Sequence, residues 1–467
     1  MIRVPRGTPV LTAEQMRAAE QACFDAGVSQ EELMERAGTA VAREAARFAF
    51  GRPVLVLAGP GNNGGDAYVV ARLLRQWGHD VIVAALGGKE AGAAGMMRSR
   101  WDGETVTLDD AEPRPVLVDG LFGTGMSRAL EGEARKALHR LSQAAAFVLA
   151  IDLPSGFATD SGEDLGGAPA TATVALGALK PAHLLMPALE RCGTVLHADI
   201  GIPGESDICS LSRPHLVAPA RDSHKYSRGL VLVVEGEMPG AARLSARAAL
   251  HGGAGYVMLA GQGGGGNGPD ALVHRSVESA DDLQHLLGDD RISAVVIGPG
   301  LGRGERSQAL LGVAIACEHR LVIDGDALTL LGRDAERRIS GRTAETVLTP
   351  HEGEFGRMFD DGDGGKLDRT VSAARRICAT IVHKGPDTVI AHPDGRVVMS
   401  GDSSPWLSTA GTGDVLAGLC GARMAKGNAH AAAEAVWLHT RAAALAGPAF
   451  CADDLIGRIP DAIGECV

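Results

Sequence analysis

The part of the sequence that points most directly to chemistry is Ser-Thr-Ala-Gly-Thr-Gly-Asp at residues 408–414, which runs into the apolar segment Val-Leu-Ala-Gly-Leu. The first turn of a helix presents backbone N–H groups without partners and a partial positive charge. Glycines let a phosphate approach those donors closely. We therefore interpret residues 408–414 as an anion cradle with the Asp414 carboxylate beside the anion. The alternative is an ordinary helix that Asp414 caps at its N-terminus.

Three further polar turns follow apolar segments in the first half of the chain. They are Gly-Pro-Gly-Asn-Asn-Gly-Gly-Asp at 59–66, Asp-Gly-Leu-Phe-Gly-Thr-Gly at 119–125 and Asp-Leu-Pro-Ser-Gly at 152–156. Ligands of open parallel sheets bind beyond the carboxyl ends of the strands, so these turns are expected to converge on one polar site. Asn63, Asp119 and Ser155 supply oxygen atoms of the kind that hold a hard cation. The alternative for each strand-end aspartate is a turn or cap residue.

The first of these turns has the Gly-x-Gly-x-x-Gly spacing of dinucleotide-binding sites, but two features of phosphate-binding turns are missing. Gly87, Gly88 and Lys89 stand where a dinucleotide site has its acidic residue at the end of the second strand. No Lys-Ser or Lys-Thr follows the glycines, so the turn is not a P-loop. Its Asn and Asp side chains favour a polar ligand. A turn that merely tolerates Asn in the left-handed region is the alternative.

The segments that must position these residues alternate between buried strands and helices, as in an α/β protein. Strands are expected at 53–58, 81–86, 116–119, 147–152, 230–234, 293–297 and 320–323. Helices are expected at about 240–251, at 430–447 and from 453 on. Capping-box spacing after Thr12 and Ser29 predicts two more helices, which end near Gly27 and Phe50. Polar, proline-containing residues at 205–222 indicate a boundary, which gives domains 1–218 and 219–467.

Composition and charge set the broad class of the protein. The chain has 467 residues, 45% hydrophobic and 22% charged, so two globular domains are expected. A formal net charge of −12 argues against nucleic acid or an anionic membrane as a partner. The eight cysteines show no zinc spacing and the N-terminus has no apolar signal core, so a cytoplasmic location is predicted. No apolar run approaches the ~18 residues that a transmembrane helix needs.

Together, and in this order along essentially the whole chain, the motifs resemble those of the bifunctional NAD(P)H-hydrate repair enzymes. The first half carries the resemblance in Leu-Met-Glu-Arg-Ala-Gly at 33–38 and in the three turns above. The second half carries it in Gly-Pro-Gly-Leu-Gly at 298–302, Asp-Gly-Asp-Ala-Leu at 324–328, Thr-Pro-His-Glu-Gly-Glu at 349–354, His-Lys-Gly at 383–385 and Gly-Thr-Gly-Asp at 411–414. The sequence departs from the family pattern at Trp406 and Ala410, in the loop before the cradle.

The resemblance implies a Rossmann-like epimerase domain followed by a ribokinase-like dehydratase domain that uses ADP or ATP, each with three layers. In the first domain it places the substrate against Asn62, Asn63, Gly64, Gly65, Asp66, Gly123, Thr124, Gly125, Met126, Ser127, Arg128, Ala129 and Asp152. It places a potassium ion on Asn63, Asp119 and Ser155. In the second domain it places the substrate against Ala254, Gly300, His351 and Asp414, and the nucleotide against Lys384, Gly385, Pro386, Asp387, Thr388 and Gly413. It also implies magnesium and a homo-oligomer.

By this resemblance, Asp414 accepts a proton from the hydrate hydroxyl as that hydroxyl attacks a phosphoryl group. Asp152 is the candidate proton shuttle of the epimerase, ahead of Asp66. His351 is a competing base or a structural residue. Two other functions stay open. One is a ribokinase-like small-molecule kinase, such as a hydroxymethylpyrimidine kinase, with an N-terminal ligand-binding domain. The other makes the first domain an interaction module.

Overall fold

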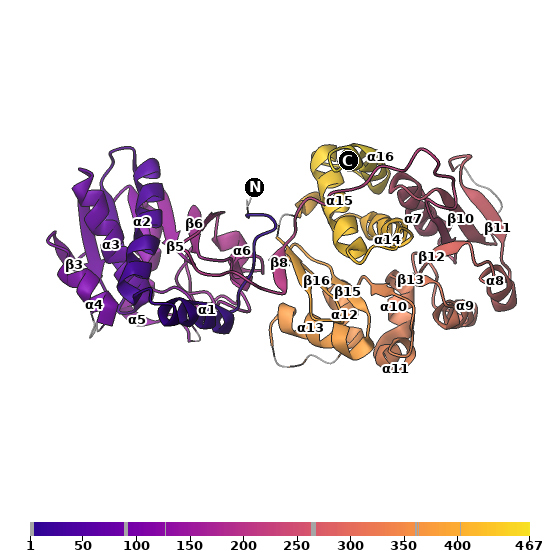
Figure 1. The fold of residues 1–467 in the computed structure, drawn as a ribbon, viewed down its shortest axis with the longest axis horizontal. Helices are drawn as coiled ribbons and strands as arrows, with labels where there is room; N and C mark the ends of the chain where they lie inside the picture. Colours follow the sequence, from indigo (N-terminus) through magenta and orange to yellow (C-terminus); the bar gives the residue numbers. More distant parts are fainter. Residues whose placement is uncertain are drawn as a thin grey trace. The chain divides into compact units, whose positions relative to one another are not determined.

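A computed structural model describes residues 4–87, 92–126, 128–262, 268–359, 362, 364–401 and 403–467. The chain divides into two compact units, Met1–Ser210 and Leu211–Val467, and each is described by itself (Figure 1). The division falls after Ser210, somewhat before the boundary expected at 218. Both units have the predicted α/β class, with sheets of mainly parallel strands.

The first unit is built on a sheet of parallel strands in the order β3-β2-β1-β4-β5-β6-β7. The strands are β1 (Val54–Ala58), β2 (Val81–Ala85), β3 (Thr105–Thr107), β4 (Val116–Gly120), β5 (Phe147–Ile151), β6 (Ala172–Leu176) and β7 (Thr194–Ala198), and β8 (Ile208–Ser210) ends the unit. The chain builds outward from β1 to β3 and then continues on the other side of β1 with β4. Ligands of α/β sheets bind at such a reversal, beyond the carboxyl ends of the strands. The register pairs Ala58 with Gly120 and Asp119 with Ala150, so the turns after β1, β4 and β5 begin at one level.

The helices of the first unit cover both faces of this sheet. They are α1 (Ala13–Asp25), α2 (Gln30–Ala49), α3 (Asn62–Gln76), α4 (Gly92–Ser99), α5 (Gly132–Ala144), α6 (Ala188–Arg191) and the 3₁₀ turn η1 (Pro181–His183). Alternate residues of β1 belong to two separate cores. Val54 and Val56 lie in a core with α2 and α3, whereas Leu55 and Leu57 lie in a core with α5. This alternation gives the three layers predicted for the unit.

The predicted helix starts in this unit are largely confirmed. Thr12 caps α1 with a complete capping box, in which Gln15 returns its side chain to the Thr12 backbone. Ser29 caps α2 by accepting the Glu32 N–H at 3.1 Å, but the return half of that predicted box is absent. The Glu32 carboxylate instead pairs with Arg36, one turn further along the helix. The two helix ends lie at Asp25 and Ala49, close to the predicted positions.

Gly38 sets the distance between α2 and α3. A methyl group added at Gly38 would lie 2.4 Å from Cβ of Val69, which is too close for any ordinary contact. We therefore expect Gly38→Ala to lower the free energy of unfolding by about 1–3 kcal/mol, the usual cost of overpacking a core. Calorimetry of the full chain checks this. Gly312→Ala, on α9 (Glu305–Ala316) and with nothing within 4 Å, is the control and should be neutral or slightly stabilising. Equal transitions for the two variants would contradict the expectation.

The second unit contains strands in the order β11-β10-β9-β12-β13-β14-β15-β16-β17. Their bounds are β9 (Leu230–Val234), β10 (Tyr256–Gly261), β11 (Val273–Ser276), β12 (Ile292–Ile297), β13 (Arg320–Ile323), β14 (Thr346–Leu348), β15 (Thr380–His383), β16 (Thr388–Ala391) and β17 (Val397–Ser400). Pairing is parallel from β11 to β15 and antiparallel from β15 to β17. The strands predicted at 230–234, 293–297 and 320–323 are confirmed.

Helices also cover both faces of this second sheet (Figure 1). On one face lie α7 (Pro239–His251), α14 (Thr412–Met424), α15 (Ala431–Ala446) and α16 (Ala452–Gly464), which share a core with Val231 and Val233. The remaining helical elements are α8 (Ala280–Leu286), α9, α10 (Gly325–Leu331), η2 (Gly332–Asp334), α11 (Ala335–Ile339), α12 (Glu352–Met358), α13 (Lys366–Ile377) and η3 (Pro405–Leu407). Among the described residues, none of the helices is both long enough and apolar enough to cross a membrane.

Candidate functional sites

A cavity of about 370 Å³ lies in the first unit where the turns after β1, β4 and β5 meet. Among the residues predicted from the sequence, those that line it are Asn62, Asn63, Asp66, Gly123, Thr124, Gly125, Met126 and Asp152. Helix α1 supplies a further wall through Met16, Arg17 and Glu20, and Lys180 adds a cation. The cavity is therefore polar on one side and bordered by ionisable groups on the other.

Some predicted residues of this site do not line the cavity. Gly64 and Gly65 serve close packing, since added methyl groups would lie 1.8 Å from the Gly59 carbonyl oxygen and 2.4 Å from Sδ of Met34. Arg128 and Ala129 are exposed and are not among the lining residues. Ser127 lies outside the described residues.

The predicted substrate loop at 62–66 is in fact the first part of a helix. Helix α3 begins at Asn62 with Gly61 as its N-cap, so Asn62, Asn63 and Asp66 project from its first turns. The close approach of Gly64 to Gly59 lets the helix start almost directly after β1. The free N–H groups of this helix start therefore lie at the wall of the cavity, where they favour a polar or anionic ligand group.

Of the predicted cation ligands, Asn63 lines the cavity, whereas Asp119 and Ser155 are buried and are not among its lining residues. The Asp119 carboxylate is 2% exposed and accepts hydrogen bonds from Ser155 Oγ at 2.6 Å and from Ser155 N at 2.8 Å. Burial raises the pKa of Asp119, and hydrogen bonds from Ser155 and Leu121 oppose that rise. No Lys or Arg pairs with Asp119 among the described residues. Nδ2 of Asn63 is buried without a partner there, so this amide is also available to a ligand.

Asp152, at the end of β5, forms a buried ion pair with Lys180. Lys180 is fully buried, and its Nζ donates to Oδ1 of Asp152 and to the Leu176 carbonyl oxygen at 2.7 Å. The Leu176 N–H also donates to Asp152 Oδ1, at 3.1 Å. Asp152 has a φ of 63°, in the left-handed region that few residues other than glycine adopt. Its backbone is held in that strained conformation by its neighbours.

The neighbour that holds both Asp152 and Lys180 is His183. Its Nδ1 accepts the Lys180 backbone N–H at 2.9 Å, and its Nε2 therefore carries the hydrogen that binds the Asp152 carbonyl oxygen at 2.7 Å. Burial, together with the nearby charge of Lys180, lowers the pKa of His183 to about 4. The ring is thus neutral near pH 7 and serves as a fixed bridge between the two charged residues.

Asp66 and Glu20 are carboxyl groups on other walls of the cavity. Asp66 is 9% exposed, and burial raises its pKa well above the ordinary value, with further contributions from Asp152 and Glu20. Burial also raises the pKa of Glu20. The cavity therefore holds carboxyl groups in different surroundings, since Asp152 is paired with a lysine and burial raises the pKa of Asp66 and of Glu20.

In the second unit, the predicted cradle is the N-terminus of α14. Gly411 is the N-cap, with a φ of 90°, and Asp414 projects from the first helical turn. The alternative that Asp414 caps this helix is therefore wrong. Thr412 closes the turn, since its hydroxyl donates to the carbonyl oxygens of Leu407 and Thr409 at 2.8 and 2.9 Å. The first-turn N–H groups next to Gly413 are thus arranged as an anion site.

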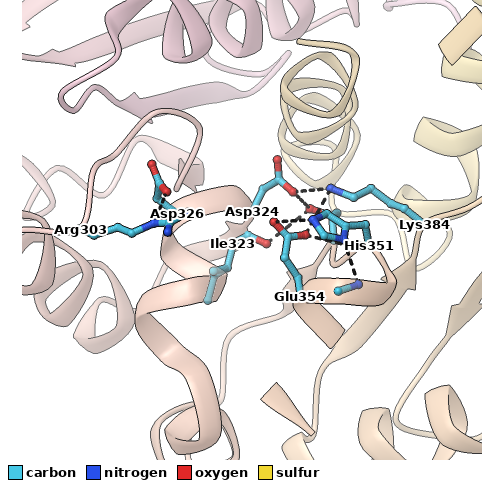
Figure 2. A network of polar contacts seen from close by, with 9 residues as sticks. Arg303, Ile323, Asp324, Asp326, His351, Glu354 and Lys384 are labelled. Atoms are coloured by element: carbon cyan, nitrogen blue, oxygen red, sulfur yellow. Dashed lines mark hydrogen bonds and ion pairs between the residues drawn. The ribbon is translucent and has the colours of Figure 1, made fainter. Parts of the chain in front are cut away.

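Lys384 brings a positive charge to this cradle, and Figure 2 shows its side chain pointing toward Asp324. Its Nζ lies 2.8 Å from Asp324 Oδ1 and 4.0 Å from Glu354 Oε2, and Thr349 also donates to Asp324 Oδ1, at 2.7 Å. A methyl group at Gly413 would lie 3.6 Å from Lys384 Nζ, so the ammonium reaches the start of α14. Burial opposes the charged form of Lys384, but the carboxylates of Asp324 and Glu354 raise its pKa.

The surroundings of Asp414 favour its protonated form. Burial and the carboxylates of Asp324 and Asp326 raise the pKa of Asp414 to about 6, against the opposing charge of Lys384. A base with a pKa near the working pH can take a proton and release it again. Asp326 itself accepts the Gly302 N–H at 3.0 Å and pairs with Arg303 at 2.8 Å. This contact fixes the glycine turn after β12.

The other predicted substrate contacts of the second unit are a core residue, a turn glycine and a helix cap. Ala254 is buried in the hydrophobic core. Gly300 has a φ of 61°, and an added methyl group would lie 2.3 Å from the Met238 carbonyl oxygen. His351 caps α12 through Nδ1, which accepts the Gly353 N–H at 3.0 Å, and its side chain is 56% exposed.

The segment predicted to bind the nucleotide is a short turn between β15 and β16. Gly385 and Pro386 are at its surface, whereas Asp387 and Thr388 are buried. Lys366 Nζ pairs with Asp387 at 2.6 Å, and Thr388 Oγ1 donates to the Gly385 carbonyl oxygen at 2.8 Å. These contacts fix the turn, in which Pro386 is exposed and Gly385 is half-buried.

The comparisons with known proteins cover both units. Residues 231–461 match a family model described as NAD(P)H-hydrate dehydratase, and residues 30–182 match one described as YjeF-related protein N-terminus. The chain is 35% identical to a bifunctional NAD(P)H-hydrate repair enzyme Nnr of Thermofilum pendens, over 84% of this chain and 82% of the relative. A protein of the same name from Gloeobacter violaceus is 36% identical, over 92% of each chain. A solved ADP/ATP-dependent NAD(P)H-hydrate dehydratase from Bacillus subtilis is 25% identical and covers 54% of this chain and 95% of its own, with a TM-score of 0.47.

Proposed function

The chain belongs to the family of bifunctional NAD(P)H-hydrate repair enzymes, and we propose that it repairs hydrated NADH and NADPH by two reactions. The first unit interconverts the two epimers of the hydrate. The second unit dehydrates one epimer, the S form, to NAD(P)H at the expense of ADP or ATP. Asp414 is the residue on which this proposal depends most, because it projects from the first turn of the anion cradle, which the Lys384 ammonium also reaches.

The substrate chemistry explains why a nucleotide is needed. Water that adds across a double bond of the reduced nicotinamide ring leaves a hydroxyl group at C6, in either of two configurations. Hydroxide is a poor leaving group, whereas phosphate leaves readily. Transfer of a phosphoryl group from ADP or ATP to the hydroxyl oxygen is therefore proposed to precede elimination, which restores the double bond.

The proposed roles follow from the positions of the side chains. Asp414 takes the hydroxyl proton as the oxygen attacks the terminal phosphoryl group, a role that contributes roughly 10²–10⁴-fold to the rate. The N–H groups at the start of α14 stabilise the charge that develops on the phosphoryl oxygens, and one such donor can contribute about 3 kcal/mol. Lys384, Gly385, Pro386, Asp387 and Thr388 would hold the nucleotide beside Gly413, with the Lys384 ammonium against its phosphates.

The donor set at this site fits a magnesium ion bound mainly through the nucleotide. Among the described residues there is no cluster of three or more His, Cys, Asp or Glu side chains that could hold a metal alone. Mg²⁺ at phosphate sites needs only one or two carboxylates in addition to phosphate oxygens and water. Asp324 and Glu354, both within 4.0 Å of Lys384, are the carboxylates proposed to hold it. The ion would neutralise phosphate charge during transfer.

The oxygen atoms around Asp119 fit a potassium ion. Its donors are the side-chain oxygens of Asn63, Asp119 and Ser155, and the Asp119 carboxylate has no cationic side chain beside it among the described residues. Hard, weakly charged cations prefer such oxygen ligands. A bound ion would fix the turns after β1, β4 and β5 relative to one another.

Potassium should therefore raise the stability of the first unit. A ligand at ten times its dissociation constant adds about 1.4 kcal/mol to the stability of the state that binds it. We expect a higher melting temperature in KCl than in tetramethylammonium chloride at equal ionic strength. Asp119→Asn should remove the difference, and the exposed Asp109→Asn should keep it. An identical response of wild type and Asp119→Asn would remove the ion from this site.

The test of the proposed function is incubation of the full chain with a mixture of NADH hydrate epimers. With ADP or ATP, the absorbance of reduced nicotinamide should recover for the whole mixture. Without a nucleotide, the epimers should interconvert and no absorbance should return. A small-molecule kinase would instead give a stable phosphorylated product, with no recovery of absorbance.

The resemblance also supports two proposals about the setting of the enzyme. Copies of the chain are proposed to associate into a homo-oligomer, which light scattering of the purified protein tests. A cytoplasmic location is proposed because all eight cysteines are free thiols, as expected for a reducing compartment. Its ligands are proposed to be the hydrates and the adenine nucleotide, without nucleic acid or membrane.

A further inference from the structure

The ionisable groups around the first-unit cavity are not equivalent. Asp152 is paired with Lys180 and receives a second hydrogen bond from the Leu176 N–H. Asp66 is also nine-tenths buried and lines the same cavity, yet no hydrogen bond or ion pair to its carboxyl group is found in the described part of the chain. Glu20 lies on the third wall, on α1. One buried carboxyl group is thus compensated by a cation, and one is not.

The compensated pair cannot easily rearrange. Lys180 is fully buried, and its ammonium has two acceptors, Asp152 and the Leu176 carbonyl oxygen. His183 fixes the backbones of both Lys180 and Asp152 through its two ring nitrogens. The charge of Lys180 is therefore directed at Asp152 and is not shared through a hydrogen bond with Asp66.

We propose that Asp66 is the general acid of epimerisation and that Lys180 is a positioning residue, which holds Asp152 as the anionic general base. This inference rests on the proposed epimerase function. It keeps Asp152, the stronger candidate from the sequence, as the base and gives Asp66, the weaker candidate, the role of the acid. It also assigns a role to a lysine that no sequence motif indicated.

The chemistry of the hydrate suits such a pair. C6 carries both the hydroxyl group and a bond to the ring nitrogen, so the nitrogen lone pair can expel the hydroxyl. The Asp66 carboxyl gives its proton to the hydroxyl oxygen, the C6–O bond breaks, water leaves, and a ring iminium forms. Water then adds to the opposite face of C6 and gives one proton to the Asp152 carboxylate, while the iminium electrons return to nitrogen. The next turnover follows transfer of that proton to Asp66 through cavity water, so no other reactant is consumed.

The charges around the cavity agree with Asp66 as the acid and Asp152 as the base. Burial, Asp152 and Glu20 all raise the pKa of Asp66, and Lys180 opposes them, so Asp66 keeps its proton above the range of an ordinary aspartate. The other groups that face the cavity or its charged pair are Arg17 and Glu20 on α1 and His183 on η1. Of these, His183 is neutral, and Arg17 acts on Glu20.

The experiment follows exchange between purified epimers by the full chain, across pH and without nucleotide. We expect Asp66→Asn to slow exchange by roughly 10²–10⁴-fold, the usual contribution of a positioned acid. Asp109→Asn, an exposed aspartate of the same unit, should exchange at the wild-type rate. Lys180→Met removes the cation that positions Asp152, so exchange should slow through a lower kcat with little change in KM. Thermal unfolding of each variant, compared with that of wild type, reports whether the first unit is folded.

A measurement on the unmodified protein keeps the proposal testable if Lys180→Met does not fold. In ¹³C NMR of carboxyl-labelled wild type, several aspartates, including Asp119 and Asp414, should titrate above the ordinary range, and one such signal should be missing from Asp66→Asn. Wild-type exchange by Asp66→Asn, a wild-type kcat in a folded Lys180→Met variant, or the loss of no high-titrating signal in Asp66→Asn would overturn the inference. Absence of exchange by wild type itself would instead refute the proposed epimerase function.

Discussion

Replacement of Asp414 by asparagine is expected to abolish nucleotide-dependent dehydration while epimer exchange continues unchanged. Asparagine keeps the shape of the side chain but cannot take the hydroxyl proton, so the rate should fall by roughly 10²–10⁴-fold or more. Exchange should persist because its residues lie in the cavity of the first unit. Recovery of reduced-nicotinamide absorbance from the S epimer measures the first reaction, and chromatography of the epimers measures the second.

The matched control for this variant is Asp368→Asn. Asp368 occupies the third position of α13, as Asp414 does in α14, but it is exposed and belongs to no proposed site. Both substitutions remove an acidic group from the first turn of a helix, so any loss of stability from the helix dipole should be similar. Dehydration by Asp368→Asn should stay at the wild-type level. Near-normal dehydration by Asp414→Asn would remove Asp414 from the mechanism.

The pH dependence of dehydration is an independent test of Asp414 as the base. Asp414 must be ionised to accept a proton, and its pKa is raised to about 6. The kcat/KM of dehydration, which reports groups of the free enzyme, should therefore fall as the pH drops through about 6, well above the range in which an ordinary aspartate titrates.

Replacement of Asp152 should have the second large effect, confined to the other reaction. We expect Asp152→Ala to reduce epimer exchange by roughly 10²–10⁴-fold and to leave dehydration of the S epimer intact. The substitution removes the proposed base and leaves the buried Lys180 ammonium without its anion. An uncompensated buried charge also destabilises a fold, typically by about 3–5 kcal/mol when one partner of a buried pair is lost. Exchange rates and thermal unfolding of the same samples separate the two effects.

Two further variants make this separation sharper. Asp152→Asn keeps a residue type that tolerates the φ of 63° at this position. The double variant Asp152→Asn with Lys180→Met removes both charges, so it should recover stability relative to Asp152→Asn alone and remain inactive in exchange. Unchanged exchange by Asp152→Ala, or recovery of exchange in the double variant, would contradict a chemical role for Asp152.

The sequence predicted the regular elements well because their signals are local. Thr12 and Ser29 marked the helix starts, and continuous apolar runs marked buried strands such as β1 and β9. Residues 59–66 were interpreted as a turn, since glycine and asparagine usually signal one, whereas α3 already begins at Asn62. Only the close approach of Gly64 to Gly59 shows that a helix fits there. The start of α14 was predicted too late in the same way, which made Asp414 a possible cap.

The sites were predicted in part because their residues come from turns at one edge of a sheet. Asn63, Asp119 and Asp152 each follow a strand, so their convergence follows from α/β topology. Lys180 was not predicted because it lies in Ala-Leu-Lys-Pro, with no motif around it, and its pairing with Asp152 depends on the path of the chain after β6. The Lys384–Asp324 pair likewise spans 60 residues of sequence. The position of Glu20 in the wall of the cavity depends on how α1 packs against the sheet. No local sequence pattern specifies that packing.

The most direct measurement starts from the purified R epimer of NADH hydrate, the form that dehydration alone leaves unrepaired. With ADP or ATP, the wild-type chain should return all of it to NADH. Asp414→Asn should convert it to an epimer mixture with no recovery of absorbance, and Asp152→Ala should leave it unchanged apart from the spontaneous rate. A 1:1 mixture of these two variants should restore full conversion, since each supplies the reaction that the other lacks. Failure of wild type to recover NADH from the R epimer, or recovery by either variant alone at the wild-type rate, would contradict the account of one chain with two separate sites.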